Sequence, residues 1–325
     1  MREVFATIRK ALKSARTALI VSHVDPDGDS IGSMICMGMI LTDLGINTDL
    51  YSQDGVPRIY RFLPGVERVK NETRADLHYD LLVSVDASDL KRLGDRFDPR
   101  KIANKLINVD HHPDNSRFAD INYVEQSSST AELVFKLAKY LKINITKAMA
   151  ENLYVALITD TGNYRYENTS AATFAMAGEL ISTGLDTHEI TTKIYDTRTI
   201  ASIRVQALAL AALETSPDRK VAWVTVTQEM MDKVGAKGED LVGLVDIVRS
   251  IEGVEVAILF REEHGKVKIN FRSKEKVNVS EIARKFGGGG HIRAAGAIFK
   301  EDVETVKKRV VPEVLKFVKA LKYLV

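Results

Sequence analysis

The sequence predicts an α/β protein: a mainly parallel sheet with helices on both faces, and a smaller C-terminal α/β domain joined to it by a helical connector. Three observations indicate this fold. Short β-branched runs alternate with helical patterns through the first half, 325 residues can bury two cores, and 45% apolar with 28% charged residues is an ordinary globular composition. The expected domains are 1–185 and 218–325, with the connector at 186–217.

The first half supplies candidate strands and helices in alternation. Each strand candidate is a short apolar run, such as TALIVSH, and each helix candidate carries apolar residues at helical spacing. Ser129 and Glu132 have the spacing of a capping box, which marks a helix start. The expected strands are 17–23, 47–52, 80–86 and 106–110, and the expected helices are 30–44, 129–141, 147–158 and 171–182.

The second half begins with a long helical pattern. From Asp186 to about Glu214 there is no strand signal and little Gly or Pro, and Ser216-Pro217-Asp218 is a typical break. Strands and helices then alternate again, which predicts the smaller domain. The expected strands are 221–227, 254–261 and 266–272, and the expected helices are 240–250, 280–286 and 303–323.

Bulk properties limit the possible partners. The longest nearly apolar run, at 31–41, is eleven residues, whereas a membrane span needs roughly 18, so no membrane partner is expected. The start of the chain lacks the features of a secretory signal, and the one cysteine, Cys36, cannot form an internal disulfide. We therefore expect a cytoplasmic protein.

Charge is balanced overall but unevenly distributed. The net charge of +2 is too small for a protein that coats long DNA or RNA. From Arg219 onward the balance is +6, and the part before it has −4. This division suits metal cations in one half and a phosphate-bearing ligand in the other. Surface charge without a role explains it equally well.

The most informative motif follows the first predicted strand. In HVDPDGDSIG, His23 precedes three aspartates at every second position: Asp25, Asp27 and Asp29. Ligands of open α/β sheets bind beyond the carboxyl ends of strands, where this segment is expected. Without cations, carboxylates packed together would repel one another. The alternative is a solvent-exposed acidic turn, because Asp-Gly and Asp-Pro are turn formers.

Three further segments end in the same residue types. One predicted strand ends at Asp86, the next at Asp110-His111-His112, and an apolar helix ends at Asp160. An unpaired buried carboxylate is costly, so one shared metal site is the simplest explanation. Imidazole and carboxylate ligands suit Mn²⁺ or a similar ion, and their number is enough for two divalent metal ions acting on a phosphoryl group.

These segments, across residues 17–170, resemble in order and spacing the motifs of the DHH phosphoesterase superfamily. Its members include exonucleases, short-oligonucleotide RNases, cyclic-dinucleotide phosphodiesterases and one class of pyrophosphatase. The resemblance implies the following ligands: His23 and Asp27 for the first ion, Asp29, His111 and Asp160 for the second, and Asp86 bridging, with a catalytic role. It also implies that His112 is catalytic, stabilising charge on the phosphate or protonating the leaving oxygen. Asp25 falls between the ligand positions, and we expect it either to support the ligands from behind or to be structural.

A glycine run marks the second domain. Four consecutive glycines lose extra conformational entropy on folding, so a backbone requirement such as close approach to a phosphate is expected; a flexible hinge is the alternative. The run, with His291, resembles the signature of the first type of DHH-associated domain, whereas the pyrophosphatases carry a different one. The residues expected to bind substrate are Gly288, Gly289, Gly290, His291, Arg272 and Ser273, with Arg261 and Arg293 as further phosphate ligands.

The resemblance is to the compact two-domain enzymes, without the additional nucleic-acid-binding domain of large single-strand exonucleases. It implies hydrolysis of dinucleotides and very short RNAs (pApA, nanoRNA, cyclic di-AMP) to 5′-mononucleotides such as AMP, with no long nucleic acid as substrate. A phosphatase acting on 3′-phosphoadenosine 5′-phosphate (pAp) is the nearest alternative, and a nucleotide sensor without activity is another. A homodimer is expected from the resemblance alone.

Overall fold

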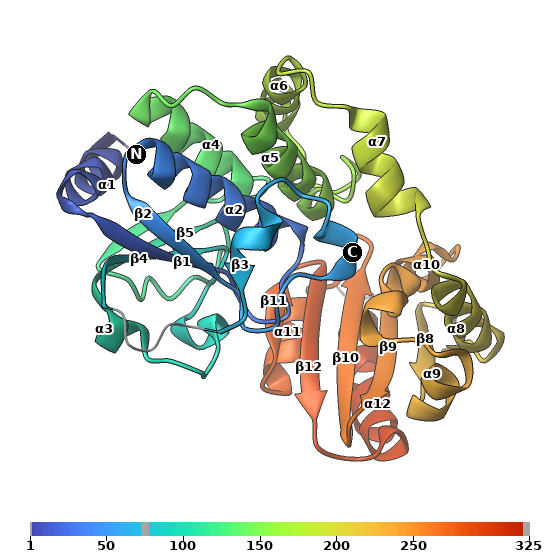
Figure 1. Ribbon diagram of the computed structural model, residues 1–325. Helices are drawn as coiled ribbons and strands as arrows, with labels where there is room; N and C mark the ends of the chain where they lie inside the picture. Colours follow the sequence, from blue (N-terminus) through green and yellow to red (C-terminus); the bar gives the residue numbers. More distant parts are fainter. Residues whose placement is uncertain (1, 73–77, 321–325) are drawn as a thin grey trace. The chain divides into compact units, whose positions relative to one another are not determined.

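The structure is a computed structural model that describes residues 2–72 and 78–320. The chain divides into two compact units, Met1–Asp196 and Thr197–Val325 (Figure 1). The predicted connector, 186–217, is shared between them, because Ile190 and Ile194 belong to the core of the first unit and Val205 and Ala209 to a core of the second. None of the described helices is long and apolar enough to cross a membrane.

The first unit is built on a six-stranded sheet with the order β3-β2-β1-β4-β5-β6, in which every pair of neighbours is parallel. The order reverses between β1 and β4, so the segments that follow these two strands flank the position where open α/β sheets bind ligands. The predicted α/β fold with a mainly parallel sheet is confirmed. The strands are β1 (Thr17–Val21), β2 (Asn47–Tyr51), β3 (Val69–Lys70), β4 (Tyr79–Val85), β5 (Ala103–Asp110) and β6 (Ile121–Val124).

Alternate residues of each strand point to opposite faces of this sheet. Ile20 and Val83 pack in the larger core with α1, α2 and α4, and α5 packs on α2. Leu19 and Leu82 point to the other face, which shorter elements cover, among them α3 and the 3₁₀ turn η3 (Figure 1). The elements are α1 (Arg2–Ser14), α2 (Gly28–Asp43), η3 (Leu90–Leu93), α3 (Pro99–Ile102), α4 (Thr130–Leu141), α5 (Lys147–Asp160), α6 (Ala171–Ile181), α7 (Thr187–Thr191) and a π turn (Thr192–Asp196).

The N-termini of α2 and α4 lie where the predicted metal ligands of the first unit gather. Asp27 is the N-cap of α2, where its Oδ1 accepts the Ser30 amide at 3.0 Å, and Ser129 is the N-cap of α4, as the sequence predicted. Gly32 lets α2 and α5 approach closely, since a Cβ atom there would lie 2.3 Å from the Asn152 carbonyl oxygen. The close approach brings the start of α2 beside the end of α5.

The second unit holds a mixed six-stranded sheet with the order β11-β12-β10-β9-β8-β7. Its β8–β9 pair is parallel and the other pairs are antiparallel. The predicted second α/β domain is confirmed. Its elements are α8 (Ile200–Ala211), β7 (Glu214–Thr215), β8 (Val221–Val226), α9 (Gln228–Val234), η5 (Gly238–Leu241), α10 (Leu244–Ser250), β9 (Val256–Glu263), β10 (Lys266–Ser273), α11 (Val279–Lys285), β11 (Gly289–His291), β12 (Ala294–Phe299) and α12 (Val303–Ala320).

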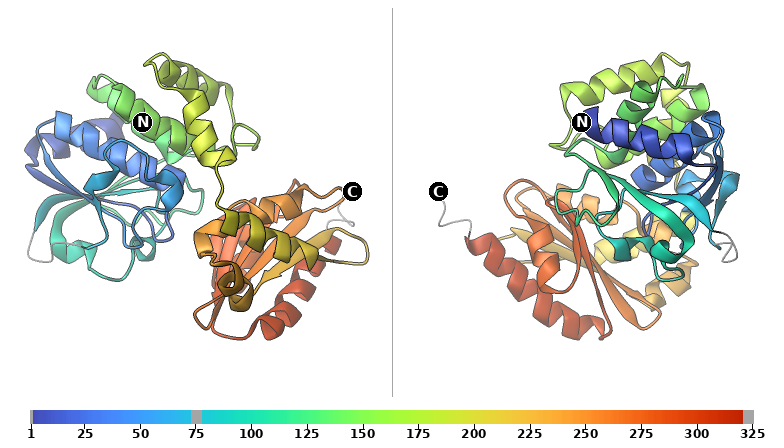
Figure 2. Two further views of the ribbon diagram at one scale, coloured as in Figure 1. Left: turned by 45° about the vertical axis from the view of Figure 1, so that its right-hand side comes forward. Right: turned by 90° about the vertical axis from the view of Figure 1, so that its left-hand side faces the viewer.

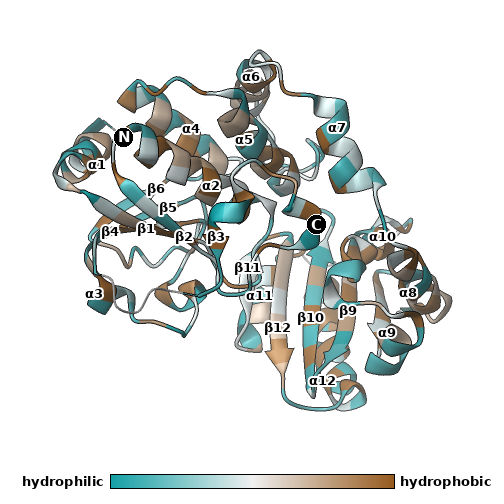
Figure 3. Ribbon diagram, viewed as in Figure 1, coloured by the Kyte–Doolittle hydropathy of each residue, from teal (hydrophilic) through white to brown (hydrophobic). Residues whose placement is uncertain are grey.

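The two faces of this second sheet are covered differently. Helices α11 and α12 pack on one face (Figures 1 and 2), and α8, α9 and α10 cover β8 and part of β9 on the other. On that other face β10 presents Lys268, Asn270 and Arg272, all half-buried. The strand therefore alternates between hydrophilic and hydrophobic residues along its length (Figure 3).

Several sequence expectations are wrong in detail. The predicted continuous helical pattern is interrupted at 197–199, and a short strand, β7, begins at Glu214. The helix expected from Asp240 begins at Leu244, because Gly243 has a left-handed φ of 84° that ends the preceding turn. Part of the glycine run belongs to the sheet, since Gly289–His291 forms β11. Helix α12 was expected to reach Tyr323, which lies outside the described residues.

Candidate metal centre

His23 follows β1, and the backbone carbonyl of the next residue orients its ring. Its Nδ1 lies 2.7 Å from the Val24 carbonyl oxygen, which can only accept, so this nitrogen donates the hydrogen bond. The other nitrogen, Nε2, then faces two carboxylates, 3.5 Å from Asp86 Oδ2 and 3.8 Å from Asp27 Oδ1. A carbonyl that orients the ring in this way is the usual support of a histidine that binds a metal.

Asp86 lies at the end of β4 with a left-handed φ of 59°, which is rare for a residue with a side chain. Its side chain is 2% exposed, and its two oxygens point to different imidazoles. Oδ2 faces His23, whereas Oδ1 is 3.6 Å from His111 Nε2 and accepts a hydrogen bond from Thr130 Oγ1 at 2.9 Å. One carboxylate therefore lies between two groups of ligands.

The second group gathers around His111, directly after β5. Its Nε2 lies 3.6 Å from Asp160 Oδ2 and 3.9 Å from Asp29 Oδ2. Its Nδ1 lies 3.2 Å from the Ser127 carbonyl oxygen, the same kind of support that His23 has. Asn168 donates to Asp160 Oδ2 at 3.3 Å and to the Ser128 carbonyl at 2.8 Å, and so links the two segments.

Asp29 has a second role that the sequence did not reveal. Its Oδ2 accepts the Thr130 amide at 2.6 Å, and its Oδ1 accepts the Ala131 amide at 3.0 Å and the Ser33 hydroxyl at 3.0 Å. These amides belong to the first turn of α4, where a negative charge is stabilised by the helix dipole. The helix start thus fixes a carboxylate that comes from a segment 101 residues away.

His112 stands beside these two groups and is paired with Asp110. Its Nδ1 lies 2.7 Å from Asp110 Oδ1, and Asp110 also accepts a hydrogen bond from Asn115 at 2.6 Å. Burial disfavours the charged ring, but the hydrogen bond and charge of Asp110 outweigh it and raise the pKa of His112. A buried carboxylate that orients an imidazole is a common arrangement in acid–base catalysis.

The electrostatics of the centre favour cations. Burial opposes charge on His23 and His111, yet the surrounding carboxylates raise the pKa of each to about 10. Burial, Asp86 and Asp27 raise the pKa of Asp160 to about 6, against the effect of His111. In the metal-free chain the two imidazoles therefore hold protons at neutral pH, and a divalent cation would displace them.

The residues fit such a cation. The imidazole–carboxylate separations of 3.5–3.9 Å are too long for hydrogen bonds, but the ligand atoms of each group lie within 4.8 Å of one another. Nitrogen and oxygen donors without thiolate suit Mn²⁺ and similar ions. The groups are His23, Asp27 and Asp86 on one side and Asp29, His111 and Asp160 on the other.

Asp25 is not in either group. It is exposed, has a left-handed φ of 52°, and its amide donates to Asp54 Oδ2 at 2.7 Å. This contact joins the turn between His23 and Asp27 to Asp54.

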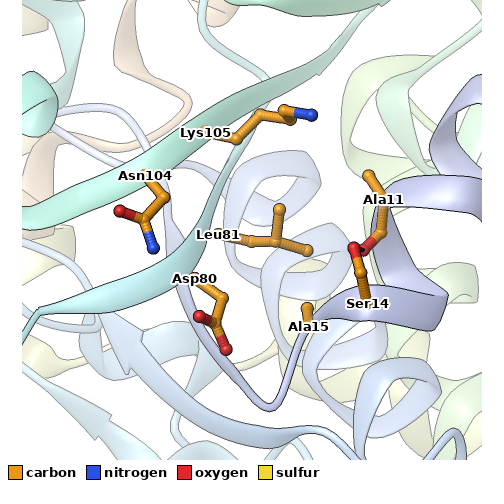
Figure 4. Close-up of a pocket in the computed structure, with 7 residues that line it drawn as sticks. All are labelled: Ala11, Ser14, Ala15, Asp80, Leu81, Asn104 and Lys105. Atoms are coloured by element: carbon orange, nitrogen blue, oxygen red, sulfur yellow. Dashed lines mark hydrogen bonds between the residues drawn. The ribbon is translucent and has the colours of Figure 1, made fainter.

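The unit also has a hollow of about 180 Å³ at the amino ends of β4 and β5 (Figure 4), the edge of the parallel sheet opposite to the metal ligands. Asp80, Lys105 and Ser14 line it. None of the predicted site residues is among its lining residues.

Strand register in the second unit brings several predicted substrate residues onto one sheet face. Arg272 pairs with Ala294, which pairs with His291, and Gly289, two residues before His291, is the next residue of β11 on the same face. Directly opposed residues point to the same side, so these side chains share the face that α11 and α12 leave uncovered. All three predicted residues are half-buried or exposed.

Steric contacts explain some of the glycines of the run but not all of them. A Cβ atom at Gly288 would lie 2.0 Å from the Gly296 carbonyl oxygen, and one at Gly290 would lie 2.5 Å from that of Ala294. Close approach of β12 thus accounts for both. At Gly289 nothing lies within 4 Å of such an atom. Packing of the described residues therefore leaves Gly289 unexplained.

Three other predicted residues have hydrogen-bond or ion-pair partners of their own. Ser273 is buried and donates to the Val277 carbonyl at 2.7 Å, on the opposite face from Arg272. Arg293 donates to the same carbonyl at 3.2 Å. Arg261 pairs with Glu263 at 2.9 Å.

Sequence reasoning missed Thr130, Asn168 and the pairing of Asp110 with His112. The last had a usable signal, because residues i and i+2 at a strand end point to the same side. Thr130 lies 44 residues from Asp86 and Asn168 lies 8 residues from Asp160, and neither belongs to a motif of acids and histidines.

Known protein families and proteins resemble this chain in sequence. Residues 17–157 match the DHH family, N-terminal domain, and residues 220–322 match the DHHA1 domain. The bifunctional oligoribonuclease and PAP phosphatase NrnA of Thermus thermophilus is 31% identical over 96% of this chain and 94% of that protein. The NrnA protein of Bacillus subtilis is 29% identical over 86% and 88% of the two chains.

A crystal structure of an exopolyphosphatase-related protein from Bacteroides fragilis superposes with a TM-score of 0.91 and 28% identity, covering 99% of this chain and 98% of that one. Fold and site together define a metal-dependent phosphoesterase, a hydrolase. The chain belongs to the DHH family, with a DHHA1 domain as its second domain.

Proposed function

We propose that the protein hydrolyses dinucleotides and very short oligoribonucleotides (pApA, nanoRNA and cyclic di-AMP) to 5′-mononucleotides such as AMP, in the cytoplasm. The observation that carries the proposal is the carboxylate of Asp86 between two imidazole–carboxylate groups, with the His112–Asp110 pair beside it. The substrate class is taken from the Thermus and Bacillus relatives, which are named oligoribonuclease and PAP phosphatase.

The proposed cofactors are two divalent cations, Mn²⁺ by preference. His23 and Asp27 would hold the first cation, and Asp86 would hold both. The second cation would be held by Asp29, His111 and Asp160. Bound cations supply a Lewis acid for the phosphoryl oxygens and make water a nucleophile at neutral pH.

Side chains of the protein supply the proton and fix the ligands in position. Asp110 raises the pKa of His112 and so favours the protonated ring, and we assign His112 to donate that proton to the departing oxygen. Thr130 and the start of α4 fix Asp86 and Asp29, and Asn168 fixes Asp160, so the ligands need little rearrangement.

The sheet face of the second unit is the proposed nucleotide-binding surface. Arg272 and His291 lie there half-buried, and Gly289 lies open beside them, so a phosphate could approach its backbone. Gly288 and Gly290 shape the hairpin, and Arg261, Arg293 and Ser273 each donate a hydrogen bond within the second unit.

The second candidate is a pAp phosphatase with the same metals, because both relatives are named for this activity as well. A substrate panel with Mn²⁺ distinguishes the two: pApA, cyclic di-AMP, pAp, and RNAs of two to twenty residues. We expect AMP release to be fastest from dinucleotides. Preference for a twenty-residue RNA would contradict the proposal, and turnover of pAp alone would favour the second candidate.

A homodimer is part of the proposal. Helix α6 exposes Phe174 (57%) and Ile181 (44%) on one side, with Ala175 and Gly178 between them. We expect light scattering to give the mass of a dimer, and Phe174→Glu to give a monomer. A monomeric mass for the unsubstituted protein would contradict it.

A further inference from the structure

We propose that Arg92 binds a phosphate group of the substrate at the edge of the metal centre, an inference that rests on the proposed function. Arg92 lies in η3, the short turn that follows Asp86. Its carbonyl accepts the Val24 amide at 2.8 Å, so its backbone is joined directly to the segment that carries His23. Asp89 caps the turn, and Leu93 is buried below it.

The side chain of Arg92 reaches His23, one of the proposed metal ligands. Its Nη2 lies 3.3 Å from His23 Nδ1, but that nitrogen already donates to the Val24 carbonyl at 2.7 Å, and two donors cannot satisfy each other. Among the described residues, no carboxylate oxygen lies within ion-pair distance of its guanidinium. Arg92 is exposed, so its donors are open to a ligand from solvent.

The charge of the centre supplies the reason for such an arginine. Two divalent cations would balance the four carboxylates of Asp27, Asp29, Asp86 and Asp160, and His112 is already paired with Asp110. A phosphodiester or phosphomonoester adds one or two negative charges to this balanced set. The planar guanidinium of Arg92 matches two phosphate oxygens at once, in a way that a lysine does not.

A purely structural role would also place Arg92 here, through an effect on His23. The two roles differ in what they change. An effect on His23 alters the affinity for Mn²⁺, whereas a phosphate contact alters the affinity for the phosphate group and leaves the metal in place. The backbone contact with Val24 remains in any substitution, so the variants retain the turn.

The test is titration of AMP and of adenosine into the Mn²⁺-loaded full chain, for the unsubstituted protein, Arg92→Ala, Arg92→Lys and the neighbouring control Lys91→Ala. We expect Arg92→Ala to weaken AMP binding about ten- to hundredfold, Arg92→Lys to be intermediate, and Lys91→Ala and the adenosine affinities to be unchanged. Mn²⁺ affinity, measured separately, should be nearly unchanged in every variant, because the His23 Nε2 atom that faces the carboxylates is not the atom near Arg92.

Unchanged AMP affinity in Arg92→Ala, or a loss that follows a loss of Mn²⁺ affinity, would overturn the proposal. Turnover of pApA by the unsubstituted protein is measured in parallel. Absent turnover contradicts the proposed substrate, while the binding titrations still decide the role of Arg92.

Discussion

Three of the proposed metal ligands of the first unit differ in burial from three of the proposed substrate residues of the second. Asp86, His111 and Asp29 are buried, and other side chains or backbone groups fix each of them. Arg272 and His291 are half-buried, and Gly289 is open to solvent. Groups that hold charge for a reaction need fixed positions, whereas groups that admit a ligand need access.

The largest expected effect comes from the carboxylate between the two imidazoles. Asp86→Ala removes the group that faces both His23 and His111, and we expect AMP release from pApA to fall more than about a thousandfold, or ~4 kcal/mol of barrier. Circular dichroism checks the fold, and Asp86→Asn is the variant of similar volume. The matched control, Asp25→Ala, should keep most activity. Retained turnover in both Asp86 variants would show that the centre does not work as proposed.

The next effect tests whether His112 supplies a proton. We expect His112→Gln to lower kcat about a hundredfold with little change in Mn²⁺ affinity. Because the charged ring is the donor, kcat should fall as pH rises through the raised pKa of His112. Asp110→Asn removes the charge that raises that pKa, so the alkaline limb of the pH profile should move to lower pH. A limb that stays in place would exclude this assignment.

A smaller effect separates structure from binding within the glycine run. Gly288→Ala would place a Cβ atom 2.0 Å from a carbonyl oxygen of β12, so we expect it to destabilise the second unit by about 2 kcal/mol. Gly289→Ala should leave stability unchanged and weaken AMP binding. Urea unfolding can be followed by the fluorescence of Trp223, the one tryptophan, which lies in β8. Equal stability losses in the two variants would contradict the distinction.

The smallest effect concerns the metal-free centre. Since the pKa of His23 and of His111 is about 10 there, Mn²⁺ must displace protons, and its affinity should rise with pH about tenfold per pH unit for each proton released, ~1.4 kcal/mol. Calorimetry of Mn²⁺ binding in buffers of different ionisation enthalpy counts those protons. An affinity that is constant between pH 6 and 8 would show that the imidazoles are neutral before the metal binds.

The sequence predicted the parts of this protein that depend on local pattern. Strand ends that carry Asp86 and Asp110 could be found because a buried apolar run stops at an acid, and parallel strands bring such ends to one edge. The contacts of Thr130 with Asp86 and of Asn168 with the Ser128 carbonyl depend on packing between distant segments, which no local pattern encodes. Part of the glycine run forms strand β11 although propensity disfavours glycine in strands, because these residues pair with β12, a contact between separate segments.

Asp29 connects the metal centre to the stability of a helix. Its oxygens accept the first amides of α4 and also face His111, so the same carboxylate takes part in two equilibria. Binding of an ion at this group must then be linked to local opening of the helix start. Amide hydrogen exchange at Thr130 and Ala131 would therefore report on occupancy of the centre from within the protein core.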